Sequence, residues 1–189
     1  MAKAYLIHGA YGGPDENWFP WLRSCLEQRG HEVITPSFPT PEGQSLSAWF
    51  DIFESHVPGL DESAVLVGHS LGPVFIANIL NKYEVHVAGS IFVAGFRALL
   101  GNPDFDEINS TFVEEPLDFQ RVGNRGGTVI AYVSENDPYV PLKDALEFAE
   151  NVGARIVRVP NAGHFNAAAG YSEFPSVLDD CLALLDSFS

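Results

Sequence analysis

Residues 64–75 read AVLVGHSLGPVF, and this stretch decides which fold the chain is expected to adopt. The run 64–67 is apolar without alternation, which predicts a strand buried on both faces of a parallel sheet. The pattern G-x-S-x-G at 68–72 follows at once, and the largely apolar segment 72–83 has the length of a helix. A strand, a sharp glycine-flanked turn and a helix in this order predict that Ser70 projects above the end of the strand.

The succession of strand and helix recurs on both sides of this stretch. Apolar runs rich in Val, Ile and aromatic residues predict strands at 4–8, 32–37, 64–69, 87–94, 128–134 and 155–160. The stretches between and after them predict helices at 18–29, 46–56, 72–83, 142–152 and 172–188. Strands that alternate with helices form parallel sheets with right-handed crossovers. We therefore predict an α/β fold with about six parallel strands and helices on both faces.

The interval 97–125 departs from this rhythm. It has no strand-like run, its composition is mixed and polar, and it contains Pro103 and Pro116. A connection of this length exceeds most connections within compact domains, so we expect a small lid or short helices over the edge of the sheet. Neither a repeat nor a linker divides the sequence, and residues 1–189 are expected to form a single domain.

The balance of charge restricts the possible partners. The 189 residues include 25 acidic and 10 basic side chains, which gives a formal net charge of −15 at pH 7. A field of this sign repels nucleic acids and anionic membranes, and no stripe of Lys and Arg offsets it. We therefore expect no nucleic-acid partner and no membrane partner, while the oligomeric state stays open.

The cysteines and the first residues indicate a cytoplasmic protein. Cys25 and Cys181 are too few for a disulfide framework or a four-ligand zinc site, so both are expected to be reduced. The apolar run 4–7 is shorter than the roughly 7–15 residues of a signal peptide's apolar core or the about 20 of a membrane span. The sequence shows no cluster of metal ligands, and we expect neither a metal nor a cofactor.

Ser70 is the candidate nucleophile. The glycines two positions before and after it let the chain turn sharply and approach its neighbours closely. Its hydroxyl would then lie at the carboxyl edge of the sheet, where open α/β folds bind ligands. The structural alternative is a glycine-rich turn in which the serine caps the following helix.

A serine hydroxyl attacks only when a base accepts its proton. His164 is the preferred base, because the segment 160–164 follows the last predicted strand and opens onto the face where Ser70 is expected. His8 ends the first strand at the same edge and is the rival candidate. The other histidines are expected to be structural or solvated: His31, His56, His69 and His86.

A third group must orient the base, and a carboxylate after the preceding strand is expected to do so. Asp137 and Glu135 both follow the predicted strand 128–134. Asp137 is preferred, because it lies further into the loop and can point back over the sheet. An ordinary Asp-Pro turn is the structural alternative. The chain order Ser70, Asp137, His164 is the order found in α/β-hydrolases.

The charge that develops on a carbonyl oxygen needs hydrogen-bond donors already in place. One donor is expected to be the backbone N–H of Leu71, directly after the candidate nucleophile. The other is expected to be the N–H of Ala10 or Tyr11, in the glycine-rich loop 8–13 after the first strand. The glycines of this loop do not match G-x-G-x-x-G, so dinucleotide binding is not predicted.

With these motifs the chain resembles the retinoblastoma-binding protein 9 and YdeN family of small serine hydrolases. The resemblance covers nearly the whole chain and rests on 8–9 (HG), 17–21 (NWFPW), 68–72 (GHSLG), 136–138 (NDP) and 163–165 (GHF). It implies a compact α/β-hydrolase fold without the extra N-terminal hairpin of larger hydrolases.

The same resemblance implies roles for three residues: Ser70 as nucleophile, Asp137 as acid and His164 as base. The chain departs from the eukaryotic members at one motif. Their L-x-C-x-E sequence for binding pocket proteins is absent, because Arg23 stands two positions before Cys25 and Ala183 two positions after Cys181. A partner of that kind is therefore not expected.

Aromatic residues are expected to line a substrate pocket. The candidates are Trp18, Phe19, Phe96, Tyr139 and Phe165. They would form an apolar site for an acyl group or an aromatic leaving group, and the alternative is that they belong to the core. A short lid limits the size of the pocket, which favours small esters, thioesters or amides.

Two functions from different classes compete. The first is a metal-independent serine hydrolase that forms an acyl-enzyme on Ser70. The second is an interaction protein that keeps the fold but has little turnover. The presence of all three candidate residues favours the hydrolase.

Overall fold

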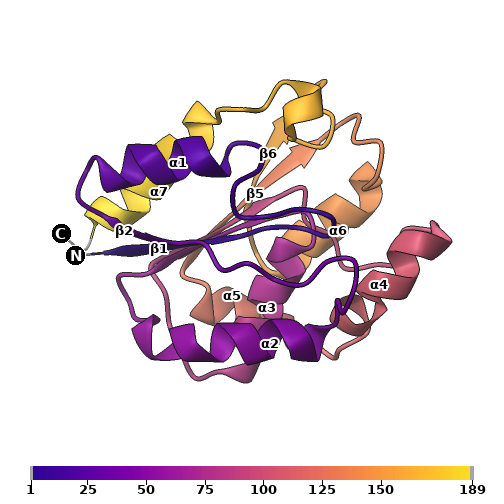
Figure 1. The fold of residues 1–189 in the computed structure, drawn as a ribbon, viewed down its shortest axis with the longest axis horizontal. Coiled ribbons are helices and arrows are strands. Elements are labelled where there is room, and N and C mark those ends of the chain that lie inside the picture. Colours follow the sequence, from indigo (N-terminus) through magenta and orange to yellow (C-terminus); the bar gives the residue numbers. More distant parts are fainter. Residues whose placement is uncertain (1, 188–189) are drawn as a thin grey trace.

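The computed structural model describes residues 2–187 and contains a six-stranded sheet. All neighbouring strands are parallel, in the order β2-β1-β3-β4-β5-β6 (Figure 1). The strands are β1 (Lys3–Ile7), β2 (Glu32–Ile34), β3 (Val65–His69), β4 (Gly89–Val93), β5 (Thr128–Ser134) and β6 (Arg155–Val159). The predicted α/β fold with a parallel sheet is confirmed.

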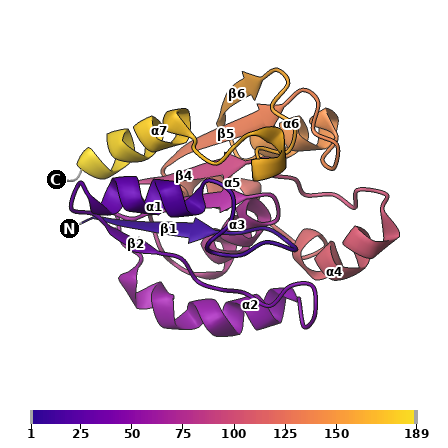
Figure 2. The same cartoon turned by 45° about the horizontal axis from the view of Figure 1, so that its top comes forward.

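Helices cover both faces of the sheet (Figures 1 and 2). One face carries α1 (Phe19–Glu27) and α7 (Pro175–Asp186), which share a hydrophobic cluster with that side of the strands. The second cluster packs the other face against five helices: α2 (Leu46–Phe53), α3 (Gly72–Lys82), α4 (Pro103–Val113), α5 (Phe119–Arg125) and α6 (Leu142–Asn151). The sheet is therefore the middle layer of three.

The central strand β3 shows why its sequence lacks alternation. Val65 and Val67 point into the cluster with α1 and α7, whereas Leu66 points into the opposite cluster. All five residues of β3 are buried. A strand that is covered on both faces needs apolar side chains at every position.

The interval 97–125 contains two helices rather than a strand. Helix α5 packs against α3 and contributes Val122 to the core. Asn102 caps the start of helix α4, and its side-chain oxygen accepts hydrogen bonds from the backbone N–H groups of Asp104 and Phe105. The segment thus supplies two helices to the covering layer, and α4 extends toward the carboxyl ends of the strands (Figure 1).

Some predicted boundaries differ from the observed ones at the ends of elements. Strand β2 ends at Ile34 instead of residue 37, since it lies at the sheet edge and pairs with no described strand other than β1. Helix α7 begins at Pro175 instead of residue 172, and Phe188, included in its predicted range, lies outside the described residues. The stretch 54–59 forms a short 3₁₀ helix, η1 (Glu54–Gly59). Within residues 2–187, none of the helices has the length and apolar character needed to cross a membrane.

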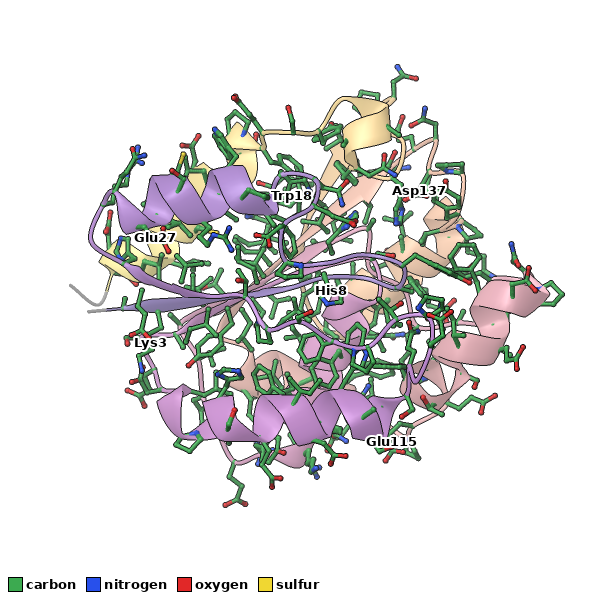
Figure 3. All side chains as sticks on the ribbon, viewed as in Figure 1. Lys3, His8, Trp18, Glu27, Glu115 and Asp137 are labelled. Atoms are coloured by element: carbon green, nitrogen blue, oxygen red, sulfur yellow. The ribbon has the colours of Figure 1, made fainter. Side chains whose placement is uncertain are left out.

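The parallel strands gather their carboxyl ends at one end of the molecule. Figure 3 shows Lys3 at the start of β1 and His8 just beyond its other end. The loops after β3, β5 and β6 emerge at the same end as His8 and carry Ser70, Asp137 and His164. Three candidate residues from distant parts of the sequence therefore meet there.

Candidate active site

Ser70 stands at the tip of the turn between β3 and α3, with a left-handed φ of +60°. Such a conformation is strained for a residue other than glycine, by about 1–3 kcal/mol. The backbone N–H of Ser70 donates to the carbonyl of Val93 in β4 at 2.9 Å, which anchors the turn to the sheet. A Cβ on Gly68 would lie 2.6 Å from the nitrogen of Pro73, so the turn requires glycine at that position.

His164 and Asp137 form a close pair beside this turn. The imidazole Nδ1 donates to Asp137 Oδ2 at 2.7 Å, and the side chains are 10% and 3% exposed, respectively. Asp137 Oδ1 accepts hydrogen bonds from the backbone N–H groups of Tyr139 and Val140 at 2.9 and 3.0 Å. Because these bonds hold the carboxylate and the carboxylate holds Nδ1–H, the lone pair of His164 lies on Nε2.

Ser70 and His164 line the same pocket. Within residues 2–187, neither Ser70 Oγ nor His164 Nε2 has a hydrogen-bond partner. Catalytic hydrogen bonds are often long until substrate binds, so the free atoms are compatible with proton transfer between them. The structure thus brings Ser70 and His164 to one pocket and joins Asp137 to His164 by a hydrogen bond.

Glu135, the alternative carboxylate, lies elsewhere. Its Oε1 is 3.6 Å from Arg158 Nε, and both side chains are about half exposed. The side chain therefore pairs with a residue of β6 on the surface and does not orient His164.

Asn136 joins the loops of the acid and the base, a role that the sequence analysis missed. Its Oδ1 accepts from the backbone N–H of Gly163 at 2.9 Å and from the hydroxyl of Ser134 at 3.0 Å. Asn136 therefore fixes the position of the residue directly before His164. Its place beside Asp137 in an Asn-Asp-Pro turn was the available signal, since Asn commonly bonds to backbone groups in turns.

His8, the rival base, is occupied on both ring nitrogens. The backbone N–H of Phe38 can only donate, so Nε2 accepts it at 3.0 Å, and Nδ1–H donates to the carbonyl of Gly9 at 2.8 Å. Burial lowers the pKa of His8. The side chain is therefore a neutral structural group in the pocket wall, with no free lone pair for a serine proton.

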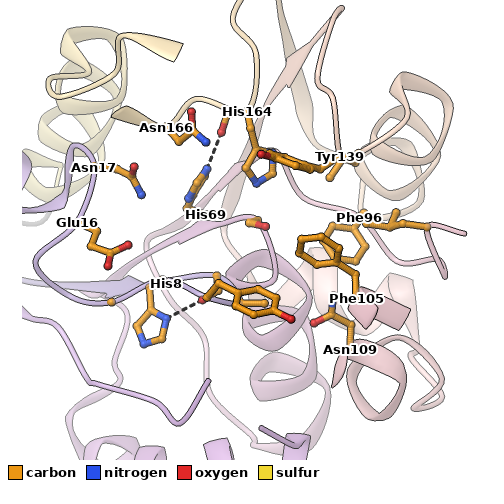
Figure 4. A pocket seen from close by; sticks show the side chains of 18 of the residues that line it. His8, Glu16, Asn17, His69, Phe96, Phe105, Asn109, Tyr139, His164 and Asn166 are labelled. Atoms are coloured by element: carbon orange, nitrogen blue, oxygen red, sulfur yellow. Dashed lines mark hydrogen bonds between the residues drawn. The ribbon is translucent and has the colours of Figure 1, made fainter. Parts of the chain in front are cut away.

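His69 connects the nucleophile turn to the base loop. Its Nε2–H donates to the carbonyl oxygen of His164 at 2.8 Å, as the dashed line in Figure 4 shows. Burial, together with the nearby His164, lowers the pKa of His69 to about 3. A neutral His69 therefore fixes the backbone of His164 from the turn that carries Ser70.

The loop after β1 closely approaches Ser70. A Cβ on Gly9 would lie 2.6 Å from Ser70 Cβ, so a side chain there would displace the candidate nucleophile. The N–H groups of Ala10 and Leu71 have no acceptor within residues 2–187 and stay available for a substrate oxygen. The N–H of Tyr11 donates to Thr40 Oγ1 at 2.7 Å, which removes Tyr11 from the candidate donors.

The pocket has a volume of about 260 Å³ and contains part of the predicted aromatic lining. Phe19, Phe96 and Tyr139 line it, and the exposed ring of Tyr139 contacts the ring of His164 edge-on, with centroids 5.0 Å apart. In Figure 4, Phe96 and Tyr139 lie on the side of the pocket opposite Glu16 and Asn17.

Trp18 and Phe165 do not line this pocket, so their assignment to it was wrong. Both are completely buried in the cluster beneath α1 and α7. Trp18 Nε1–H donates to the carbonyl oxygen of Phe165 at 2.9 Å. This hydrogen bond thus anchors the loop that follows His164 to the core, and the surfaces of both aromatic rings belong to the core.

The described residues contain no site that resembles a metal centre. No group of three or more His, Cys, Asp or Glu side chains within residues 2–187 is placed to hold a metal ion.

The chain is similar to known proteins over nearly its whole length. A family model described as serine hydrolase matches residues 4–182. The chain is 28% identical to the Bacillus subtilis protein YdeN over 179 residues, which are 94% of this chain and 93% of YdeN. It is 26% identical to the serine hydrolase RBBP9 of Rattus norvegicus over 166 residues, 86% of this chain and 87% of that protein.

A solved structure extends the similarity to three dimensions. The crystal structure of the ydeN gene product from Bacillus subtilis matches with a TM-score of 0.91 at 26% sequence identity. The match covers 98% of this chain and 100% of that chain. The two chains therefore share the arrangement of elements, including those that carry the candidate site.

Proposed function

The chain belongs to the serine hydrolase family, and we propose that it hydrolyses small neutral esters through an acyl-enzyme formed on Ser70. Family membership confirms the resemblance seen in the sequence, and the chain is an enzyme, a serine hydrolase with an α/β-hydrolase fold. One observation supports the proposed roles most strongly. It is the 2.7 Å hydrogen bond from His164 Nδ1 to Asp137 Oδ2, in the pocket that Ser70 lines.

In the proposed acylation step, His164 Nε2 accepts the hydroxyl proton of Ser70 while Oγ forms a bond to the ester carbonyl carbon. The π electrons of the carbonyl move onto its oxygen. Asp137 keeps Nδ1 protonated and stabilises the imidazolium that forms. The backbone N–H groups of Leu71 and Ala10 donate to the new oxyanion, whose stabilisation is commonly the largest single contribution to such a reaction.

Collapse of this intermediate breaks the bond to the leaving alcohol, which takes the proton from His164 Nε2. In deacylation a water molecule occupies the position of the alcohol, and His164 accepts its proton. The water oxygen attacks the acyl carbon through a second oxyanion. The bond to Ser70 Oγ then breaks, Oγ receives the proton from His164, and the free acid leaves.

The pocket supports a small substrate. Its volume of about 260 Å³ lies below the range of roughly 300–1,000 Å³ typical of sites for drug-sized ligands. Leu100 and Phe105, in the segment 97–125, close one side of it, and we assign this segment the role of a small lid. The net charge of −15 favours neutral or cationic substrates over anionic ones.

We also propose a cytoplasmic location, no nucleic-acid partner and a single domain over residues 1–189. One feature supports the first point: Cys25 and Cys181 are both free thiols, as is usual in a reducing compartment. The charge balance supports the second, since acidic side chains outnumber basic ones by 25 to 10.

Labelling with a fluorophosphonate probe tests the proposed nucleophile. We expect the wild-type protein to be labelled and Ser70→Ala to lose both labelling and esterase turnover, with a fall in kcat of several orders of magnitude. The control is Ser24→Ala, since this serine lies on the surface of α1 and its hydroxyl bonds to Gln28 alone among residues 2–187. Retained labelling of a folded Ser70→Ala protein would show that another residue attacks. Esters, thioesters and amides with one common acyl group then rank the leaving groups.

A further inference from the structure

A chain of hydrogen bonds connects the loop after β1 with helix α4 at the wall of the pocket. The backbone N–H of Tyr11 donates to Thr40 Oγ1 at 2.7 Å, and the Thr40 hydroxyl donates to Gln44 Oε1 at 2.6 Å. Gln44 Nε2 donates in turn to Asn109 Oδ1 at 2.8 Å and to the carbonyl of Ile108 at 3.0 Å. The chain therefore ends on the amide group of Asn109.

The direction of each bond follows from two backbone groups. The N–H of Tyr11 can only donate, so Thr40 Oγ1 accepts it and turns its own proton toward Gln44. The carbonyl of Ile108 can only accept, so the Gln44 atom beside it is the amide nitrogen. That nitrogen also faces Asn109, and the Asn109 atom that it meets is therefore the oxygen.

This arrangement leaves the amide nitrogen of Asn109 free. The residue is 3% exposed and lines the pocket. Within residues 2–187, Nδ2 donates to no acceptor. It is also not among the polar side-chain atoms that are both fully buried and without a hydrogen-bond partner. Nδ2 therefore keeps an opening to solvent, and Asn109 is one of the residues that line the pocket.

The surroundings of Asn109 are apolar. Phe96, Leu100 and Phe105 line the pocket with it, and Figure 4 shows both phenylalanines on the same side as Asn109. A ligand that displaces water from a donor without replacing its hydrogen bond loses affinity. A site built to bond a polar substrate group rejects the analogue that lacks this group more strongly than a purely apolar pocket could.

We infer that Asn109 Nδ2 donates a hydrogen bond to the substrate, and that the site therefore prefers esters with an acceptor oxygen away from the scissile bond. The acceptor is a ketone or ether oxygen in the acyl chain or in the alcohol. Gln44 is the positioning residue, because it holds Asn109 Oδ1 and thereby turns Nδ2 toward the pocket. This inference rests on the proposed ester hydrolysis and names the substrate class more closely.

Matched pairs of esters test the inference. The acyl pair is methyl 4-oxopentanoate and methyl pentanoate, and the alcohol pair is 3-oxobutyl acetate and butyl acetate. Hydrolysis is followed by titration of the released acid, and kcat/KM for the oxo ester is divided by kcat/KM for its partner. Intrinsic reactivity is the same for every variant, so a change in this ratio reports the enzyme alone.

In at least one pair we expect Asn109→Leu to lower the ratio about tenfold, the effect of losing one hydrogen bond of ordinary strength. Asn109→Asp should lower it further, because a carboxylate oxygen would face the substrate oxygen. Gln44→Leu should lower the ratio in the same pair, since the Asn109 side chain is then free to rotate. Ser110→Ala is the matched control on α4, where the Ser110 hydroxyl donates to the Glu107 carbonyl. Equal ratios in wild type and Asn109→Leu for both pairs overturn the inference.

A binding measurement separates this inference from the proposed function. Ser70→Ala is titrated with 4-oxopentanamide and pentanamide, and binding is followed by NMR chemical shifts. Tighter binding of the oxo amide, lost when Asn109→Leu is added, supports the donor role even if none of the esters is hydrolysed. Equal binding of the two amides to Ser70→Ala, together with unchanged ester ratios, contradicts the donor role while esterase activity itself stands.

Discussion

At the scale of single residues, two carboxylates that are neighbours in the sequence have opposite surroundings. The Asp137 side chain is 3% exposed, and its oxygens accept three hydrogen bonds, one of them from His164. Glu135 lies on the surface beside Arg158. Only a change at Asp137 alters the charge next to the imidazole of His164.

We expect Asp137→Asn to lower kcat by about 10²–10⁴-fold, since an amide removes the charge and can impose the wrong tautomer on His164. Glu135→Gln should lower kcat by less than about tenfold, because the Glu135 side chain pairs with Arg158 on the surface and does not orient His164. Both variants are assayed side by side on one activated ester. A larger loss for Glu135→Gln would reverse the assignment of the acid.

His69 ties protein stability to pH. Its folded pKa of about 3 lies below the ordinary value of 6.5, chiefly because of burial. Between these values the unfolded chain binds a proton that the folded chain does not, so the free energy of unfolding falls as the pH is lowered. The contribution of this one group is on the order of 1 kcal/mol per pH unit. Burial lowers the pKa of His8 as well, which adds an effect of the same sign.

We therefore expect urea unfolding at pH 7.5, 6.0 and 4.5 to show a steep loss of stability below about pH 6.5. His69→Gln keeps a donor for the carbonyl of His164 but cannot be protonated, so its stability should depend less on pH. The slope is compared rather than the absolute stability, which the substitution also alters. Identical slopes for both proteins would exclude His69 as a source of the pH dependence.

Single residues differ in how far the sequence could place them. Ser70 and His164 could be placed, because each follows a strand and parallel strands deliver their loops to one edge. Trp18 and Phe165 were assigned wrongly, because an aromatic residue near a catalytic motif has the same sequence signal whether it faces the pocket or the core. Asn109 could not be found, since its orientation depends on Gln44, far away in the sequence.

At the scale of elements, the contact between β1, β3 and α3 depends on glycine. A Cβ on Gly72 would overlap with the carbonyl oxygen of Ile7 at the end of β1. The obstacle is backbone and cannot rotate away. Helix α3 can therefore start this close to the sheet only without a side chain at Gly72.

We expect Gly72→Ala to lower the free energy of unfolding by about 3 kcal/mol, the upper part of the usual cost of overpacking. Gly13→Ala is the control, because a Cβ there meets nothing within 4 Å and the backbone is not left-handed. Its effect should stay within about 0.5 kcal/mol. Urea denaturation of both variants measures the difference, and similar midpoints would contradict the close approach of α3 to β1.

The elements themselves were largely predictable where burial dictates the sequence. The boundaries of β5, Thr128–Ser134, agree with the predicted strand, because apolar residues run to its end and a turn follows. Strand β2 was predicted too long, because its pairing with β1 ends at Ile34, before Thr35, Pro36 and Ser37. For the interval 97–125, the sequence could not decide between a lid and short helices. Helices α4 and α5 pack against different neighbours, so no single hydrophobic pattern runs through the interval.

At the scale of the whole molecule, the net charge of −15 acts on every charged substrate that approaches. Attraction or repulsion of this kind changes association rates and is screened by salt, with a Debye length of about 10 Å at 0.1 M. We expect an ester with a trimethylammonium group to have a higher kcat/KM than its sulfonate analogue at 20 mM salt. The advantage should shrink at least threefold at 500 mM salt, roughly as screening predicts. A ratio independent of salt would show that the overall field does not reach the substrate.

The two ends of the described chain lie together, far from the pocket. Lys3 Nζ is 4.0 Å from Glu32 Oε2, and His31 Nε2 is 3.6 Å from Asp186 Oδ1, so adjacent residues bridge the start of β1 and the end of α7 (Figures 1 and 3). A tether attached at either end leads away from Ser70. The enzyme can therefore be anchored to a bead or an electrode with its opening toward the solution. Anchors at both ends would attach to the same side of the molecule and hold it in a single orientation.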